Sequence, residues 1–221
     1  MATVIAERLA QLPSITLLSG AHSSAEEGFC AMELASWIAG EEHSDHPECA
    51  CPIIAGFMRS WNDDLPDDER TRLLLPVIPR LVGTKGSNAL EARRATMAAD
   101  WYVCVATPAW LRLAGLDKHA DTLAAFSEIT SFENTPSIRP ALEAARKDVE
   151  AAWSAAWSAA WSGALSAAWS AAESAAESAA RSAARSAAES ALSKTKTELQ
   201  ASALDLLNRM IDVTEDELIA A

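Results

Sequence analysis

The sequence predicts an all-α protein, and three observations support that prediction. From Ala151 to Ala191 the chain repeats a four-residue unit of two Ala, one Ser and one variable position, without Pro. Ala has the highest intrinsic helix propensity, so this tract is expected to form one continuous helix. Elsewhere, capping residues and Pro separate runs with apolar residues at helical spacing. No segment has the alternating apolar and polar pattern of a half-buried strand.

The N-terminal part is expected to hold three helices. A short amphipathic helix covers residues 3–11. The sequence Ser-Ala-Glu-Glu at 24–27 is a capping box, which predicts a second helix from there to Gly40. After a polar, His-rich loop, Pro52 at a first-turn position begins a third helix that reaches about Asn62.

Further helices are expected before the repeat, and Pro separates several of them. A helix that begins at Asp67 must break or kink where it meets Pro76 and Pro79. Ser87 can cap a helix that reaches about Val105. The remaining predictions are a short turn after Pro108, a helix from Asp117 to Phe126 and a turn-rich linker over 129–139.

The variable position of the repeat changes along the tract. It reads, in order, Trp153, Trp157, Trp161, Leu165, Trp169, Glu173, Glu177, Arg181, Arg185 and Glu189. A helix turns about 100° per residue, so a position that recurs every four residues drifts by about 40° per unit. That drift is too large for the constant seam of a two-stranded coiled coil. We expect the Trp half to be covered, by the rest of the chain or by another copy, and the Glu/Arg half to face water.

The repeat also predicts the domain organisation. We expect a compact helical domain over 1–135, a long helix over 136–213 and an acidic tail over 214–221. The weakest points of the long helix are Gly163 and residues 193–197, where it would break if it folds back on the domain. Ala and Ser at three of every four positions let two helices approach closely, which favours a homo-oligomer.

The uncharged run from Ala151 to Ala172 raises the question of a membrane span. It is long enough, because a spanning helix needs about 20 residues. Its bulk is Ala and Ser, however, and its Trp residues are spread along the run, whereas Trp prefers the membrane interface. These features favour a soluble, Trp-packed helix over a membrane span, with reversible surface association as a third interpretation.

The composition is strongly acidic, with a formal net charge of −13. Nucleic-acid binding needs clustered Lys and Arg that displace counterions, so the composition argues against that class of function. An acidic decoy that binds a basic protein is compatible with it. The N-terminus lacks the apolar core of a signal peptide, and four Cys without such a signal indicate reduced thiols in the cytoplasm.

The loop between the second and third predicted helices has the highest density of side chains that could bind a metal or take part in catalysis. Four residues there can ligate Zn²⁺: His43, His46, Cys49 and Cys51. His22 and Cys30 could approach them in space. The Cys-x-Cys spacing is tighter than in the common structural zinc sites and no second pair follows, so a purely structural loop is the alternative.

Cys51 also has features of a reactive thiol. It lies at a predicted helix start, where the helix dipole lowers a thiol pKa, and His43 or His46 could act as its base. No oxyanion site is recognisable beside it, and a buried structural thiol is the alternative. The nucleotide-binding, metalloprotease and EF-hand motifs do not occur in the sequence.

Several segments carry a resemblance to known sequences. They are the run at 28–84, with its SDHPxC pattern at 44–49 and its FxRSWND pattern at 57–63, the pair at 100–101, and the runs at 107–123 and 199–212. Together they resemble an uncharacterised family of bacterial and bacteriophage proteins, in which a helical N-terminal part precedes a variable Ala-rich tract and a similar end. The resemblance implies a shared helical fold, and it carries over no activity and no site residues.

The sequence therefore favours a non-enzymatic structural or interaction protein. Its Ala-rich helix would mediate self-association or docking to a protein partner, through the apolar positions Trp153, Trp157, Trp161, Leu165 and Trp169. The alternatives are a metal- or thiol-dependent enzyme centred on residues 43–51 and an acidic decoy. No cofactor is expected, apart from Zn²⁺ if the enzyme alternative holds.

Overall fold

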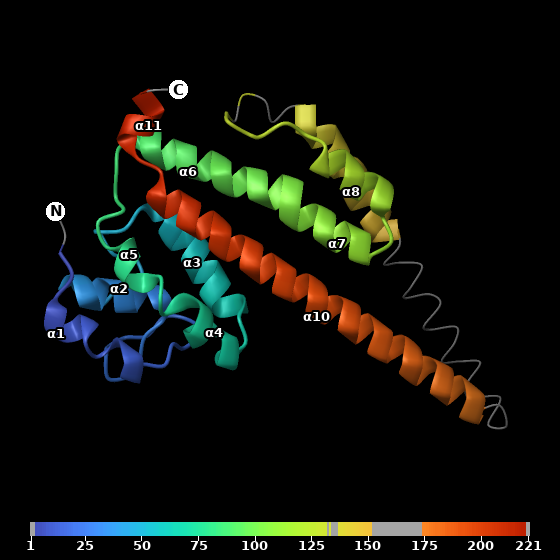
Figure 1. Ribbon diagram of the computed structural model, residues 1–221, viewed down its shortest axis with the longest axis horizontal. Coiled ribbons are helices and arrows are strands. Elements are labelled where there is room, and N and C mark those ends of the chain that lie inside the picture. Colours follow the sequence, from blue (N-terminus) through green and yellow to red (C-terminus); the bar gives the residue numbers. More distant parts are fainter. Residues whose placement is uncertain (1–2, 132, 134–136, 152–173, 220–221) are drawn as a thin grey trace. The chain divides into compact units, whose positions relative to one another are not determined.

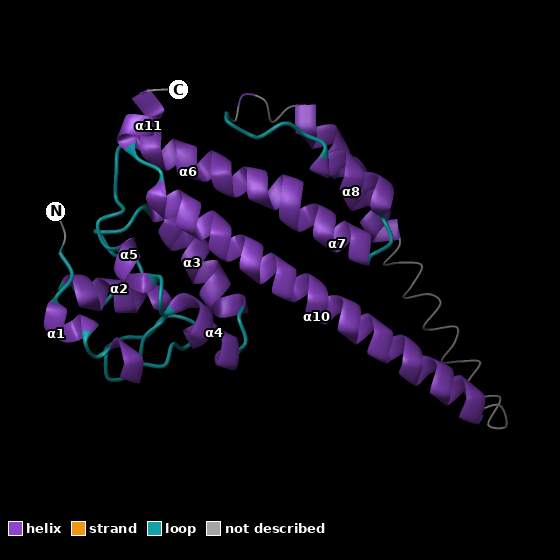
Figure 2. Cartoon of the chain, in the orientation of Figure 1, coloured by secondary structure: helices purple, strands orange, loops and turns teal. Residues whose placement is uncertain are grey.

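The computed structural model describes residues 3–131, 133, 137–151 and 174–219, and within these ranges it describes no side chain of residues 174–189 or 219. Over the described residues the protein is all-α, as predicted, with no strand (Figure 1, Figure 2). One isolated bridge pairs Leu17 with Phe29. The chain divides into two compact units: unit 1 is Met1–Met97 with Leu204–Ala221, and unit 2 is Ala98–Ala203.

Unit 1 is built around one largely buried helix, α2. Its elements are α1 (Ala6–Leu9), the 3₁₀ turn η1 (Leu12–Ser14), α2 (Ala31–Ala39), α3 (Pro52–Asp64), α4 (Asp67–Leu74), α5 (Ile78–Leu81), most of α6 (Asn88–Trp101), the end of α10 (Ser174–Asp212) and α11 (Glu215–Ile219). Helix α2 packs against α1, α3 and α5. Met32, Leu34 and Ile38 on α2 have no exposed surface, so this apolar helix forms the centre of the core.

Unit 2 has a smaller core between short helices. It contains the end of α6, the π turn η2 (Tyr102–Ala106), α7 (Thr107–Leu113), α8 (Asp117–Ala124), the helical residues 137–151 and α10 as far as Ala203. Leu111, Ala120, Leu123 and Ala145 form its buried cluster, which joins α7, α8 and the 137–151 helix. The Trp101 indole N–H donates to the Ser202 hydroxyl at 2.8 Å.

The second predicted helix starts later than the capping box at 24–27 indicated. Helix α2 begins at Ala31, and Cys30 is its N-cap. Residues 24–27 form a turn instead, in which the Glu27 N–H donates to the Ser24 carbonyl at 3.2 Å. Gly28 follows with φ of +125°, outside the helical region, so the chain cannot continue this turn into α2.

The predicted effects of Pro on the following helices are confirmed, with one difference. Helix α4 ends at Leu74 and α5 begins at Ile78, with Pro79 in its first turn. The segment after Pro108 is not a turn but helix α7, which continues from α6 through η2. Pro108 has no N–H and its ring clashes with the carbonyl four residues earlier, and the wider π turn lies at this position.

Helix α10 is uninterrupted over its whole length of 39 residues. The predicted break at 193–197 is therefore wrong, and the other predicted break, Gly163, lies outside the described residues. The predicted acidic tail at 214–221 contains helix α11. The two units are cut at other positions than the predicted domains 1–135, 136–213 and 214–221, and that domain division stays a prediction.

None of the helices within the described ranges combines the length and apolar composition that a membrane span requires. The uncharged run from Ala151 to Ala172, which raised this question, lies outside the described residues except for Ala151.

Candidate functional site

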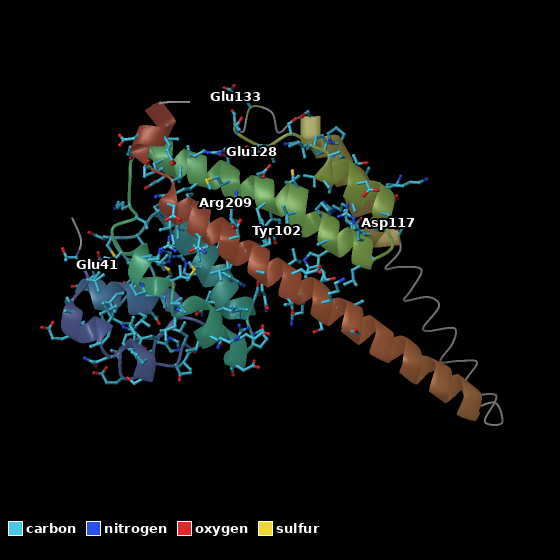
Figure 3. All side chains as sticks on the ribbon, in the orientation of Figure 1. Glu41, Tyr102, Asp117, Glu128, Glu133 and Arg209 are labelled. Atoms are coloured by element: carbon cyan, nitrogen blue, oxygen red, sulfur yellow. The ribbon has the colours of Figure 1, made fainter. Side chains whose placement is uncertain are left out.

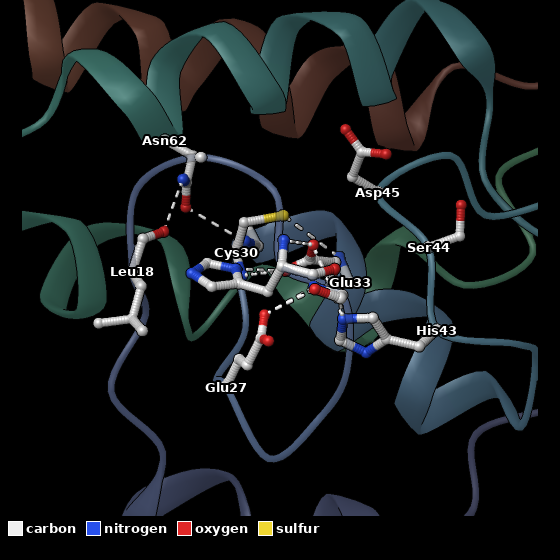
Figure 4. A network of polar contacts seen from close by, with 12 residues as sticks. Leu18, Glu27, Cys30, Glu33, His43, Ser44, Asp45 and Asn62 are labelled. Atoms are coloured by element: carbon white, nitrogen blue, oxygen red, sulfur yellow. Dashed lines mark hydrogen bonds and ion pairs between the residues drawn. The ribbon is translucent and has the colours of Figure 1, made fainter.

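The polar site of unit 1 is formed at the N-terminus of α2, where Cys30 and Glu33 make a reciprocal capping box (Figure 4). The Cys30 sulfur accepts the Glu33 N–H at 3.4 Å, and the Glu33 carboxylate accepts the Cys30 N–H at 2.7 Å. The Ala31 N–H donates to the Asn62 side-chain oxygen at 3.1 Å. These bonds satisfy backbone donors that the first turn of a helix leaves without intrahelical partners.

Glu33 is also the partner of His22, which lies in the loop before α2. The Glu33 carboxylate accepts the His22 backbone N–H at 2.5 Å and its Nδ1–H at 2.8 Å. Only 1% of the Glu33 side chain is exposed. Burial alone would raise the pKa of Glu33, but the bonds donated by His22 and Cys30 outweigh it and hold the pKa below its ordinary value. The buried carboxylate is therefore charged at neutral pH.

His43 approaches the same carboxylate from the loop after α2. Its Nε2 donates to the His22 carbonyl at 3.1 Å and lies 3.7 Å from a Glu33 oxygen. Its ring packs against Phe29, with centroids 5.6 Å apart. The Nδ1 atom of His43 is buried and has no hydrogen-bond partner. One carboxylate thus holds two imidazoles from loops on either side of α2.

The loop between Leu18 and Gly28 is fastened at its base by α3. The Leu18 N–H donates to the Phe29 carbonyl at 2.9 Å, which closes the loop. The Asn62 amide donates to the Leu18 carbonyl at 2.9 Å, and the Asp63 carboxylate accepts the Gly20 N–H at 2.7 Å. Asn62 and Asp63 belong to the FxRSWND pattern, so this part of the pattern has a structural role.

The structure does not bring the four predicted zinc ligands together. His43 is turned toward His22 and Glu33, whereas His46 is 68% exposed and lies 3.7 Å from Asp45. Cys49 and Cys51 are buried, and the Cys51 backbone N–H donates to the Thr84 hydroxyl at 3.0 Å. Over the described residues, which include this entire loop, no three His, Cys, Asp or Glu side chains are grouped to hold a metal ion.

The surroundings of the thiols oppose their reactivity. Burial, followed by the Glu41 carboxylate, raises the pKa of Cys49 to about 11. Burial also raises the pKa of Cys30 to about 12 and that of Cys104 to about 11. Since the thiolate is the nucleophilic form, these three thiols are in environments that suppress it.

Sequence reasoning considered His22 and Cys30 as neighbours of the loop but missed Glu33, the residue that joins them. Cys is outside the usual N-cap set of Ser, Thr, Asp and Asn, so the capping box at 30–33 has a weak sequence signal. The predicted interaction residues Trp153, Trp157, Trp161, Leu165 and Trp169 lie outside the described residues.

Comparisons with known proteins gave no match: no family model, no curated protein and no solved structure is similar to this chain. The resemblance to a bacterial and bacteriophage family therefore stays a prediction.

Proposed function

We propose that the chain is a non-enzymatic structural or interaction protein that associates with itself through its Ala-rich helical tract. The observation that carries the proposal is the change in exposure along α10. From Ser190 onward the helix first presents exposed side chains, with Leu192 41% exposed, and its buried residues follow only after these. Its buried residues begin at Leu199 and continue with Ala203, Leu206, Leu207 and Met210.

This spacing corresponds to one apolar face of a helix, so the C-terminal part of α10 is an anchor. At 1.5 Å per residue, 39 residues extend about 58 Å. The anchor occupies the last turns only, and the preceding turns over 190–198 offer their surface to solvent. A helix that is anchored over its last turns and exposed over 190–198 suits an interaction role.

The buried polar side chains support a structural role, because they bind the chain's own backbone. Arg70 is 3% exposed and donates to the carbonyls of Asn62 and Leu65 at the end of α3. Arg94 is 2% exposed and donates to the Met210 carbonyl at 2.7 Å. Both arginines neutralise helix C-termini, which carry partial negative charge.

The enzyme alternative gains no support from residues 43–51. Its candidate base, His43, uses Nε2 on the His22 carbonyl, and the pKa of Cys49 is raised. An enzyme of this kind needs a thiol with a lowered pKa or a set of converging ligands. These observations favour the structural proposal over a thiol- or metal-dependent one.

The test is a variant in which Ala replaces the four Trp of the repeat: Trp153, Trp157, Trp161 and Trp169. Ala preserves helix propensity, so helical content by circular dichroism is expected to hold while the molar mass from light scattering falls to the monomer value. The matched control replaces four charged positions of the same tract with Ala: Glu173, Glu177, Arg181 and Arg185. That control keeps the net charge and is expected to associate as the natural chain does; equal masses for all three proteins would refute the proposal.

A further inference from the structure

Unit 2 carries an exposed apolar stripe along one continuous helical run. The stripe consists of Tyr102, Val105, Trp110 and Leu113, which are 66%, 39%, 44% and 38% exposed (Figure 3, where Tyr102 is labelled). They follow one another on η2 and α7. At about 100° per residue, or somewhat less within a π turn, the four fall within an arc of roughly 140°. They therefore share one side of the helix.

The stripe lies in a stretch with almost no charge. Between Trp101 and Leu116 the only charged residue is Arg112, and its guanidinium is bound to Asp121 at 2.9 Å. The chain as a whole has a net charge of −13. Two copies of such a chain repel each other, so a contact between copies is least opposed where charge is missing. Aromatic residues on an uncharged patch are also the usual anchors of protein interfaces.

The sequence supplies a segment of matching chemistry. The run from Ala151 to Ala172 has no charged residue and carries four Trp and one Leu among Ala and Ser. Its small residues allow close approach and its indoles supply apolar contact area. An uncharged aromatic segment and an uncharged aromatic stripe fit each other without the desolvation of any ion.

The described residues also indicate which copy supplies the segment. Residues 137–151, which lead into it, pack through Ala141, Leu142 and Ala145 against the inner side of α7, where Leu111 is 5% exposed. Trp110 and Leu113 lie on the outer side of α7. The residues that lead into the segment therefore lie against the side of α7 that faces away from the stripe. The segment of a second copy can approach the exposed stripe directly from solvent.

We infer that the stripe of one copy binds the uncharged segment 151–172 of a second copy. This inference rests on the proposed function, because it requires the chain to associate with itself. The inference adds the surface that binds the tract. The two sides of the contact differ: one copy contributes the stripe and the other contributes its Trp segment. Two such contacts around a two-fold axis would close a dimer.

The first experiment removes the stripe and measures self-association by sedimentation velocity. The variant Tyr102→Ser with Trp110→Ser is expected to weaken dimerisation about thirty-fold or more, since truncating an interface anchor costs 2 kcal/mol or more. The matched control Leu9→Ser removes a 40% exposed apolar side chain of α1 and is expected to dimerise normally. Helical content by circular dichroism shows that both variants fold.

The second experiment identifies the occupant. Benzoylphenylalanine replaces Tyr102, equal amounts of ¹⁴N- and ¹⁵N-labelled chains are mixed, and the photo-crosslinked peptides are read by mass spectrometry. Crosslinks between differently labelled chains that join position 102 to peptides of 151–172 support the inference. Crosslinks within one chain, crosslinks to other segments, or a stripe variant that dimerises normally overturn it.

The two experiments separate this inference from the proposed function. A natural chain that is monomeric at every concentration removes the self-association on which both rest. A natural chain that associates while the stripe variant associates equally well leaves the proposed function standing and removes only the stripe.

Discussion

Glu33 shows how one buried charge can organise a set of loops. Its carboxylate accepts three N–H groups from His22 and Cys30 and is 1% exposed. The variant Glu33→Gln keeps the volume but places an amide N–H₂ against these donors, so at least one donor loses its partner. We predict a fall of about 2 kcal/mol in the free energy of unfolding, measured by urea denaturation at pH 7.

The control for this variant is Glu27→Gln, in the same loop. Glu27 accepts the backbone N–H and the hydroxyl of Ser23 at 2.9 Å each, in exposed surroundings. Water can replace these bonds, so we expect the unfolding midpoint to stay close to that of the natural chain. Equal losses in the two variants would mean that burial of Glu33 has no special role.

The pH dependence of stability follows from the lowered pKa of Glu33. A carboxyl whose folded pKa lies below its ordinary value of 4.5 binds protons less readily in the folded state, so it stabilises the fold above that value. This contribution is lost as the pH falls through the lowered pKa. We predict that the gap in unfolding free energy between the natural chain and Glu33→Gln is constant from pH 7 to about pH 5 and narrows below it. A gap that keeps its size to pH 3 would contradict this.

At the scale of single elements, Arg94 on α6 fixes the end of α10. It is 2% exposed and donates to the carbonyls of Met210 and Thr84. The variant Arg94→Met fills the space but leaves both carbonyls without this donor. We predict a loss of about 3 kcal/mol in unfolding free energy and faster hydrogen exchange at residues 204–212.

Arg209→Met is the comparison for Arg94. Arg209 is 55% exposed and pairs with Asp205 one turn earlier on α10. An exposed pair of this kind contributes little, so exchange at residues 204–212 should be nearly unchanged. If both variants speed exchange equally, the faster exchange results from a change in helix propensity, and the loss of the buried hydrogen bonds of Arg94 is not its cause.

Much of the helical order could be predicted from the sequence, because its signals are local. The end of α10 at Asp212 agrees with the predicted end near Val213, and the helix that begins at Asp67 ends before Pro76 and Pro79, as predicted. The predicted start of α2 was wrong because Gly28 adopts a positive φ, which the neighbouring residues do not indicate. The polar stretch at 193–197 was predicted as a weak point of the helix. The helix continues through it because a helix interior tolerates Lys and Thr when no Gly or Pro interrupts it.

The polar site was less accessible to sequence reasoning, since its partners are distant in the chain. Glu33 lies eleven residues from His22, and the loop that brings the two together is closed by contacts of Phe29 and Asn62. The zinc interpretation of residues 43–51 rested on the number of side chains there that can ligate a metal, and the sequence does not show where these side chains point. In the structure His43 points to Glu33 while His46 stays in solvent.

At the scale of the whole molecule, unit 1 combines residues from both ends of the chain. Arg80 on α5 binds Asp212 at 2.6 Å, and the Ser87 hydroxyl donates to Glu215 at 2.8 Å. Such pairs, more than a hundred residues apart, leave no local pattern in one sequence. The predicted boundary at 135 followed composition, whereas the units follow these contacts.

The acidic charge and the helical tract are consistent with one function at this scale. A net charge of −13 keeps copies apart in general, so association must be confined to surfaces without charge. The described part of the chain offers the stripe of Tyr102, Val105, Trp110 and Leu113, and the sequence offers the run from Ala151 to Ala172. The account therefore predicts specific assembly of limited size.

The most direct test of this account is the molar mass of the natural chain by sedimentation equilibrium over a hundredfold range of concentration. The account predicts a mass that rises from near 23.5 kDa toward a whole multiple of it and then stays constant. A mass of 23.5 kDa at every concentration would contradict it.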